Sequence, residues 1–247
     1  MSVNFLLALF SLALFATLPA FSAAADIKLD HAAVDLRDPI SLQRGAKTFI
    51  NYCLHCHSAS YMRYSRLTDL GLTEQQIKDN LLFEGEKVGQ TMTVAMRKDD
   101  AREWFGAVPP DLSVIARSRG ADWLYTYLRK FYRDESRPTG WNNTVFPAVN
   151  MPHALYQLQG AQRLEKVEVM NAAGEKHFEH KLVLAEPGQL APLEYDRLAA
   201  DLVNYLVYMS EPNKITRLQL GIVTLFFLAL FFVLALFLKK EYWKDVH

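Results

Sequence analysis

The sequence has only two cysteines, Cys53 and Cys56, and no excess of either charge. If both thiols serve another purpose, no disulfide framework is possible. The 27 basic residues balance 27 acidic ones, so the composition does not indicate a protein that binds nucleic acid or a strongly charged membrane surface. Sequence repeats and low-complexity tracts are also lacking. The 247 residues therefore predict one domain plus any targeting or membrane segments.

Charge is missing from one long apolar run near each end of the chain. The first run, residues 5–21, is dominated by Leu, Phe and Ala and is followed by Ser22 and three alanines. An apolar segment before small residues is typical of a secretory signal peptide, so we expect cleavage before Asp26. Residues 1–4 contain no Lys or Arg, which leaves an uncleaved N-terminal anchor as the alternative.

The second apolar run, residues 218–238, is long enough to cross a bilayer core of ~30 Å as a helix. A buried core helix is the alternative. Basic residues lie on both sides of the run, so the signal peptide decides the orientation better than the positive-inside rule does. The expected organisation is a signal peptide (1–25), an extracytoplasmic domain (26–213), a transmembrane anchor (214–240) and a cytoplasmic tail (241–247).

Hydrophobic periodicity predicts a mainly helical body between the two apolar runs. A first helix is expected over residues 41–56, with Gly45 and Phe49 on one face. A last helix is expected over residues 193–210, with Tyr205 in its apolar stripe. Because a glycine lets another backbone approach and an aromatic ring fills the remaining gap, we expect these terminal helices to cross.

The remaining predicted elements are shorter. Thr73 and Gln76 form a capping box that begins one helix, and Asp122 is expected to cap another. These elements are, in chain order, a helix over residues 73–83, two short helices within 111–132, an irregular loop over 136–152 and a small β-hairpin around 171–174.

The segment Cys53-Leu54-His55-Cys56-His57 carries the chemistry. C-x-x-C puts two thiols on one helical turn, where they can form thioethers with the vinyl groups of a haem, and the next residue, His57, can bind the iron. A thioredoxin-like C-x-x-C usually opens a helix after a strand, whereas this one closes a helix. A zinc site needs four convergent ligands, and these side chains are too crowded to provide them. The motif therefore predicts one haem c, attached covalently through Cys53 and Cys56.

The second axial ligand of the iron must come from elsewhere in the chain, usually from Met or His. Met151 lies in the irregular loop, where Pro152 stiffens the backbone and lowers the entropic cost of holding the thioether in place. Met151 is therefore the expected ligand, and His153 is the alternative. Met92 and Met96 are four residues apart, which predicts that they share a packed helical face.

With these features the chain resembles the cytochrome c1 family, the haem-bearing subunits of the cytochrome bc1 complex. The resemblance covers nearly the whole mature chain. It includes the C-x-x-C-H motif with residues 61–67, the P-P-D-L-S segment at 109–113, the Met151-Pro152 loop and the C-terminal anchor. C-x-x-C-H alone marks any c-type cytochrome, whereas P-P-D-L-S together with a C-terminal anchor is more particular to this family.

The resemblance implies a mainly α fold: a cytochrome c-like haem domain with a small β-hairpin insertion and one C-terminal transmembrane helix. It also implies one set of haem contacts. These are covalent attachment through Cys53 and Cys56, axial ligation by His57 and Met151, a pocket lined by Pro110, and a propionate faced by Arg66, with Arg63 as the alternative.

The resemblance further implies electron transfer within a quinol–cytochrome c oxidoreductase, from a Rieske iron–sulfur protein to a cytochrome c. The anchor would lie beside cytochrome b in a bacterial inner membrane, with the haem domain on the periplasmic side. Acidic residues within 99–103 are expected either to help dock a basic cytochrome c or to form a solvated surface. Two other functions remain open: a membrane-tethered monohaem cytochrome that serves another oxidase or dehydrogenase, and a thiol–disulfide oxidoreductase.

Overall fold

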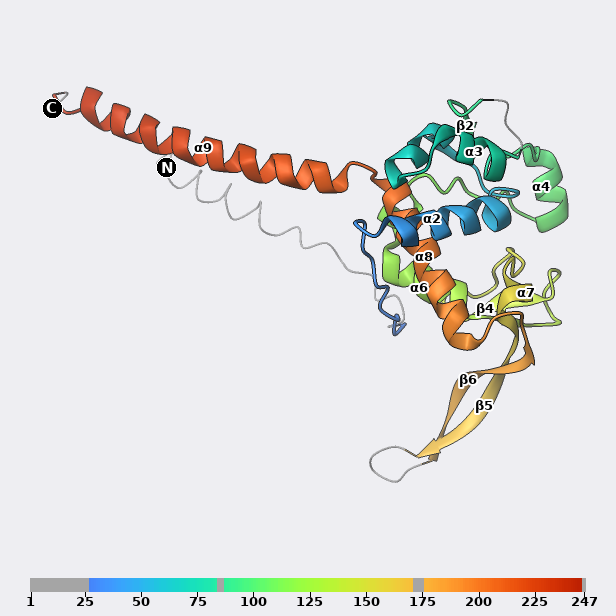
Figure 1. Ribbon diagram of the computed structural model, residues 1–247. Helices are drawn as coiled ribbons and strands as arrows, with labels where there is room; N and C mark the ends of the chain where they lie inside the picture. Colours follow the sequence, from blue (N-terminus) through green and yellow to red (C-terminus); the bar gives the residue numbers. More distant parts are fainter. Residues whose placement is uncertain (1–26, 84–86, 171–175, 246–247) are drawn as a thin grey trace, which may run out of the picture.

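The computed structural model describes residues 27–83, 87–170 and 176–245. These residues form a helical domain, a projecting two-stranded arm and one long helix that points away from the domain (Figure 1). Their strands pair only as two-stranded antiparallel sheets. The structure thus confirms the predicted mainly α fold class. The predicted signal peptide lies outside the described residues, and the domain boundaries stay predictions.

Helix α2 (Pro39–Thr48) begins two residues before the predicted start at Ser41. The carboxylate of Asp38 accepts hydrogen bonds from the backbone N–H groups of Ile40 and Ser41, both at 3.0 Å. Proline suits the first helical position, because its missing N–H would have no partner inside the helix. The helical segment ends at Cys53 rather than at the predicted residue 56, and its last part is the π-helical turn η1 (Phe49–Cys53). Such turns are frequent at functional sites.

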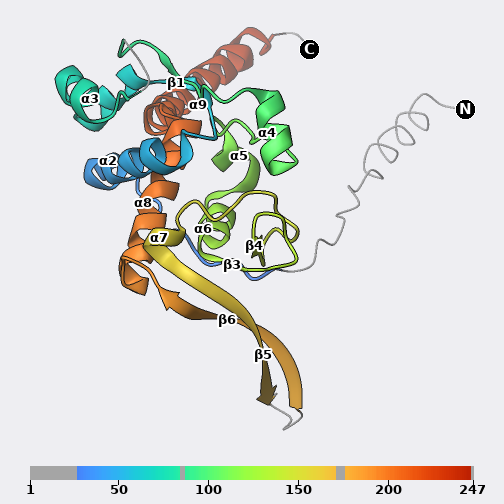
Figure 2. The same cartoon turned by 90° about the vertical axis from the view of Figure 1, so that its right-hand side faces the viewer.

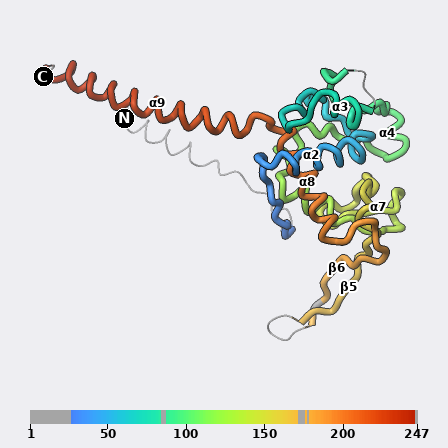
Figure 3. The backbone as a smooth tube through the Cα atoms, in the orientation of Figure 1, coloured from blue at the N-terminus to red at the C-terminus, as the bar shows by residue number. Residues whose placement is uncertain are grey.

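Helix α8 (Pro192–Ser210) crosses α2 and packs against it, as the sequence predicts (Figure 3). A Cβ atom at Gly45 would lie 2.1 Å from the carbonyl oxygen of Asp201 and 2.6 Å from Cβ of Tyr205, so only glycine fits there. The carboxylate of Asp201 also forms an ion pair with Arg44 Nε at 2.6 Å. The crossing therefore combines a close backbone contact with an ion pair at its edge.

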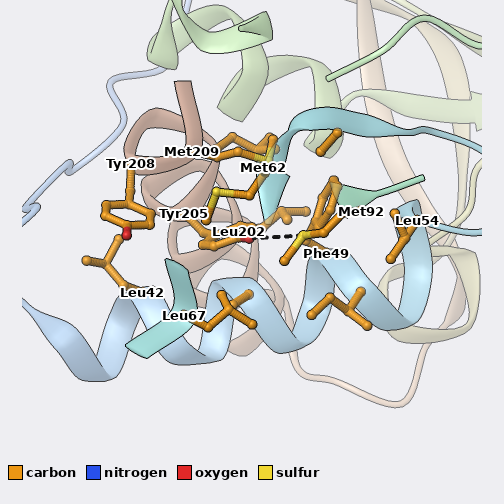
Figure 4. Packing of buried hydrophobic residues seen from close by; sticks show 14 of the residues in the cluster. Leu42, Phe49, Leu54, Met62, Leu67, Met92, Leu202, Tyr205, Tyr208 and Met209 are labelled. Atoms are coloured by element: carbon orange, nitrogen blue, oxygen red, sulfur yellow. Dashed lines mark hydrogen bonds between the residues drawn. The ribbon is translucent and has the colours of Figure 1, made fainter. Parts of the chain in front are cut away.

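The hydrophobic core surrounds this crossing, and its side chains gather between α2 and α8 (Figure 4). The rings of Phe49 and Tyr205 have centroids 5.6 Å apart. The hydroxyl of Tyr205 donates to Sδ of Met92 at 3.7 Å, which satisfies a polar group inside the core. Met62 and Leu202 are buried beside them.

A set of short elements covers one side of this core. In chain order they are β1 (Ala59–Arg63), η2 (Tyr64–Leu70), α3 (Glu74–Asn80), β2 (Thr91–Met92) and α4 (Lys98–Phe105). The capping box of Thr73 and Gln76 begins α3, as predicted. The helix predicted for Met92 and Met96 is wrong, because Met92 pairs with Ala59 in the β1–β2 sheet and α4 begins only at Lys98.

Helices α5 (Ile115–Arg119) and α6 (Ala121–Arg129) confirm the two predicted short helices. Gly120 separates them and has a φ of 87°, a region that favours glycine. The prediction that Asp122 caps a helix is wrong. Asp122 lies inside the first turn of α6, and its carboxylate accepts a hydrogen bond from the backbone N–H of Ala32 at 2.8 Å. It thereby fastens the N-terminal segment of the domain to α6.

Between α6 and α8 the chain forms, in order, β3 (Phe131–Arg133), β4 (Trp141–Asn143), α7 (Tyr156–Gln159), β5 (Gly160–Met170) and β6 (Lys176–Pro187). A short hairpin pairs β3 with β4, and its second strand lies inside the loop predicted over residues 136–152. The predicted β-hairpin is present and is longer than expected. The second hairpin projects from the domain as an arm (Figure 2), and Leu164 lies opposite Leu182 in its ladder.

Helix α9 (Lys214–Tyr242) follows α8 and extends away from the domain (Figure 1). Its apolar side chains are exposed, and it is the one helix of the described residues that is long and apolar enough to cross a membrane. A contiguous apolar surface of this size requires a cover, and a lipid bilayer supplies one. The helix therefore fits the predicted transmembrane anchor.

Replacing Gly45 by alanine should force α2 and α8 apart at their crossing. The added methyl group would overlap backbone rather than a flexible side chain, so the free energy of unfolding should fall by about 1–3 kcal/mol. Thermal unfolding in detergent, followed by circular dichroism, measures the change. Gly89→Ala is the matched control, because nothing lies within 4 Å of a Cβ there. Equal unfolding midpoints for the two variants would contradict the proposed packing constraint.

Candidate functional site

The C-x-x-C-H segment begins at the end of the π-helical turn. The backbone N–H groups of Cys56 and His57 donate to the carbonyl oxygen of Cys53, at 3.1 and 2.8 Å. This tight turn keeps both thiols and the imidazole close together, and neither thiol is in a disulfide. Leu54 is buried and fixes the turn to the core, whereas His55 is exposed, as expected of a spacer.

The imidazole of His57 is buried and held in one orientation. Its Nδ1 donates to the carbonyl oxygen of Pro110 at 2.8 Å, so Nε2 is the nitrogen available to bind a metal. Burial lowers the pKa of His57, although the bond to Pro110 and the nearby Asp111 carboxylate act in the opposite direction. The ring is therefore neutral at pH 7, which is the protonation state that a metal ligand requires.

The P-P-D-L-S segment is tied to the residues that follow His57. One oxygen of Asp111 accepts from the backbone N–H of Ser60 at 2.9 Å, and the other accepts from that of Ser113 at 2.8 Å. Burial alone would raise the pKa of Asp111, but the hydrogen bonds from Ser113 and Ser60 outweigh it and lower the pKa. The hydroxyl of Ser113 in turn accepts from the backbone N–H of Tyr61 at 3.0 Å. These contacts fix the position of the Pro110 carbonyl against His57.

Met151 lies at the end of a loop that one arginine holds in shape. Nη2 of Arg137 donates to the carbonyl oxygen of Ala148 at 2.8 Å and to Oδ1 of Asn150 at 3.0 Å. Ala148 has a φ of 60°, and its backbone N–H donates to Oδ1 of Asn142 at 2.9 Å. The loop thus turns sharply just before Met151, whose half-buried side chain packs against the small core around β3 and β4.

A tyrosine contacts the sulfur of Met151. The hydroxyl of Tyr127, on α6, donates to Sδ of Met151 at 3.4 Å. Burial raises the pKa of Tyr127, so the phenol remains protonated and keeps its donor role across the physiological range. The ring of Tyr127 stacks on Trp123, with centroids 4.9 Å apart and planes 10° apart.

His153, the alternative ligand, is buried among aromatic rings. It stacks on Phe131 with centroids 4.8 Å apart and meets the edge of Trp141 at 5.1 Å. Burial lowers the pKa of His153 to about 4. Its Nε2 is buried and has no hydrogen-bond partner within the described part of the chain. The ring thus fills the core around β3 and β4, while the sulfur of Met151 lies at the edge of that core beside Tyr127.

The chain is similar to proteins of one family over nearly all of its length. The sequence model of the cytochrome C1 family matches residues 31–246. The chain belongs to the cytochrome C1 family. Its relatives include cytochrome c1 of Allochromatium vinosum, 50% identical over 89% of this chain and 90% of the relative. Cytochrome c1 of Rhodospirillum rubrum is 28% identical, over 85% and 83%.

Another relative of similar identity carries a different name. The ammonia monooxygenase gamma subunit of Nitrosomonas europaea is 51% identical over 95% of each chain. Cytochromes c1 are the haem-bearing electron-transfer subunits of the cytochrome bc1 complex, anchored in the membrane. As a member of this family, the chain binds haem and serves in electron transport of the respiratory chain.

In this member of the cytochrome C1 family, core packing accounts for three of the six other methionines. Met62, Met92 and Met209 are buried in the main core (Figure 4), and Met170 is 66% exposed on the arm. A buried methionine that fills a core gap is not free to reach a metal without leaving a cavity. This packing favours Met151 as the source of the thioether.

The arginines expected near the propionates have protein partners in the structure. The guanidinium of Arg66 pairs with Asp69 at 2.9 Å and donates to Oδ1 of Asn213 at 3.2 Å, next to the start of α9. Arg63 donates to the carbonyl oxygen of Gly89. The structure brings Pro110 to His57 but gives Arg66 these other contacts, so a propionate role for Arg66 stays a prediction.

Sequence reasoning missed Asp111, Arg137 and Tyr127, which position the Pro110 carbonyl and Met151. The P-P-D-L-S resemblance pointed to the segment that contains Asp111 without giving its partners. No comparable local signal marks Arg137 or Tyr127, because their contacts to the Met151 loop exist only in the folded chain.

Replacing Arg137 by alanine should loosen the Met151 loop. Three hydrogen bonds to the loop would be lost, at a cost of about 1–3 kcal/mol, and backbone amides of residues 144–151 should exchange hydrogen faster. Hydrogen exchange followed by mass spectrometry measures the change. Arg163→Ala, at an exposed position on β5, is the control and should leave the loop unchanged. Unchanged exchange in the Arg137 variant would show that other contacts hold the loop.

Proposed function

We propose that the chain carries one haem c, attached covalently through Cys53 and Cys56 and ligated by His57 and Met151. In this role it takes electrons from a Rieske iron–sulfur protein and passes them to a cytochrome c. The observation that supports the proposal best is the bond between Nδ1 of His57 and the Pro110 carbonyl, next to two unpaired thiols. That bond leaves Nε2 as the metal-binding nitrogen of a ring that cannot rotate freely.

The donor set fits a haem c. When bound, haem c supplies one-electron chemistry at an iron whose potential depends on its axial ligands and on the polarity of its surroundings. The chain contributes two thiols for attachment, a neutral imidazole and a thioether. Thioether ligation together with an apolar pocket stabilises the ferrous state, which suits a carrier of relatively high potential.

The alternative as a thiol–disulfide oxidoreductase receives little support from the thiols. Burial, and to a lesser extent the neighbouring Cys56, raise the pKa of Cys53 to about 12. Burial also raises the pKa of Cys56. Catalytic C-x-x-C pairs need a lowered pKa, because the thiolate is the nucleophile. Neutral, partly buried thiols suit attachment to a prosthetic group better.

We further propose that α9 anchors the chain in a bacterial inner membrane, beside cytochrome b, with the haem domain on the periplasmic side. The apolar side chains of α9 are exposed along its length, as expected of a helix that contacts lipid or other membrane-spanning helices. Lys239 and Lys240 at its end fit the cytoplasmic face of a membrane. Residues 1–25 would then act as the signal peptide that exports the domain.

Acidic residues on α4 are candidates for docking a basic cytochrome c. Asp99, Asp100 and Glu103 lie on this surface helix, but Asp99 pairs with Arg102 at 2.7 Å. This pair partly neutralises the patch, so its contribution would be to the rate of encounter rather than to tight binding. A solvated surface with no partner remains the alternative for α4.

A second candidate function is a membrane-tethered haem carrier that serves another oxidase. One observation supports this second function: the Nitrosomonas europaea relative is named as a subunit of ammonia monooxygenase. Purification of the tagged chain from its native membranes in mild detergent separates the two functions. Recovery of a cytochrome b and a Rieske protein would support the first, and recovery of a monooxygenase without them would support the second.

Denaturing electrophoresis with haem staining tests the proposed cofactor and its attachment. We expect wild type to retain haem in the gel and the double variant Cys53→Ala/Cys56→Ala to lose it, because both thioether bonds are then absent. A wild-type band without haem stain would overturn the whole proposal. Free, titratable thiols in the native protein would then favour the thiol chemistry instead.

The absorption spectrum of the oxidised protein tests the ligand. We expect Met151→Leu to keep its covalent haem but to lose the charge-transfer band between a thioether and ferric iron. Met170→Leu, on the exposed arm, is the matched control and should keep the band. If Met151→Leu kept the band and the haem, the attachment would stand and the ligand assignment would be wrong.

A further inference from the structure

The contact between Tyr127 and Met151 goes beyond packing. The donor oxygen lies 3.4 Å from the sulfur, within the range of an O–H···S hydrogen bond. A phenylalanine would fill the same space, so the hydroxyl itself requires an explanation. A buried hydroxyl without a partner costs free energy, and the structure gives this one the sulfur of the proposed axial ligand.

The phenol ring of Tyr127 has little freedom to move. It stacks on Trp123 on one side and meets the edge of Phe131 at 5.0 Å, with an interplanar angle of 71°. Nδ2 of Asn143, on β4, donates to the carbonyl oxygen of Tyr127 at 2.8 Å. Side chain and backbone are therefore both fixed relative to the core that carries the Met151 loop.

We infer that Tyr127 is a positioning residue that holds and weakens Met151 as an iron ligand through this hydrogen bond. The inference rests on the proposed role of Met151. A thioether sulfur has two lone pairs, and a donor hydrogen bond to one of them reduces the electron density that the other can give to a metal. Ferric iron needs that density more than ferrous iron does, so the bond from Tyr127 favours the ferrous state.

The test compares Tyr127→Phe with Tyr125→Phe in the purified haem-loaded protein. Tyr125 lies on the same helix and packs against Arg129 instead of Met151, so its variant removes a hydroxyl without touching the ligand. Two quantities are measured: the midpoint reduction potential, and the concentration of added imidazole that displaces the thioether from ferric iron. The charge-transfer band shows in each variant that the thioether is still bound.

In Tyr127→Phe the equilibrium constant for reduction should fall about two- to fivefold, a part of the strength of one neutral hydrogen bond, because the bond is present in both oxidation states and differs only in strength. The imidazole concentration needed for displacement should rise by a similar factor. Tyr125→Phe should match wild type in both. Site-specific Tyr127→3-fluorotyrosine keeps the shape but makes a stronger donor, and should raise the potential. A merely structural role would not produce opposite shifts from the two changes at Tyr127.

Unchanged potential and imidazole affinity in both Tyr127 variants, with the band retained, would overturn the inference while leaving Met151 as the ligand. Persistence of the band in Met151→Leu would overturn it together with the ligand assignment. The two failures are therefore distinguishable by one spectrum.

Discussion

The close crossing of α2 and α8 is the contact on which the rest of the structure depends. These helices lie near opposite ends of the domain's sequence, and Gly45 lets the backbone of α2 approach the carbonyl oxygen of Asp201. The chain that leaves α2 enters the π-helical turn and then the cysteine motif, so the crossing fixes where the motif starts. The chain that leaves α8 enters the membrane anchor. One packing constraint thus relates the proposed haem site to the membrane-spanning helix.

Two segments that are fixed by hydrogen bonds supply the remaining residues of the proposed site. The P-P-D-L-S segment brings the Pro110 carbonyl to the imidazole of His57. The carboxylate of Asp111 holds this segment in place by accepting hydrogen bonds from two backbone N–H groups. The Met151 loop is shaped by Arg137 and backed by Tyr127. Both segments are held by hydrogen bonds that polar side chains form, most of them with backbone groups, and such bonds orient ligands more firmly than apolar packing alone does.

The sequence predicts the elements whose signals are local and misses the contacts that join distant segments. The Thr73 capping box and the small residue at Gly45 act within a few residues or by shape alone, and the structure confirms both. The helix expected for Met92 failed because a spacing of four is a short pattern, and pairing with β1 outweighed it. The bond from Tyr127 to Met151 joins residues 24 positions apart, so no local pattern announces it.

X-ray absorption at the iron edge of the purified, oxidised protein tests the central claim most directly. In the proposed function, a haem iron bound here would take its protein ligands from the imidazole of His57 and the sulfur of Met151. The proposal therefore predicts one sulfur and five nitrogen atoms as nearest neighbours of the iron. Six nitrogen neighbours would contradict it and would replace Met151 by a nitrogen ligand, for which His153 is the alternative.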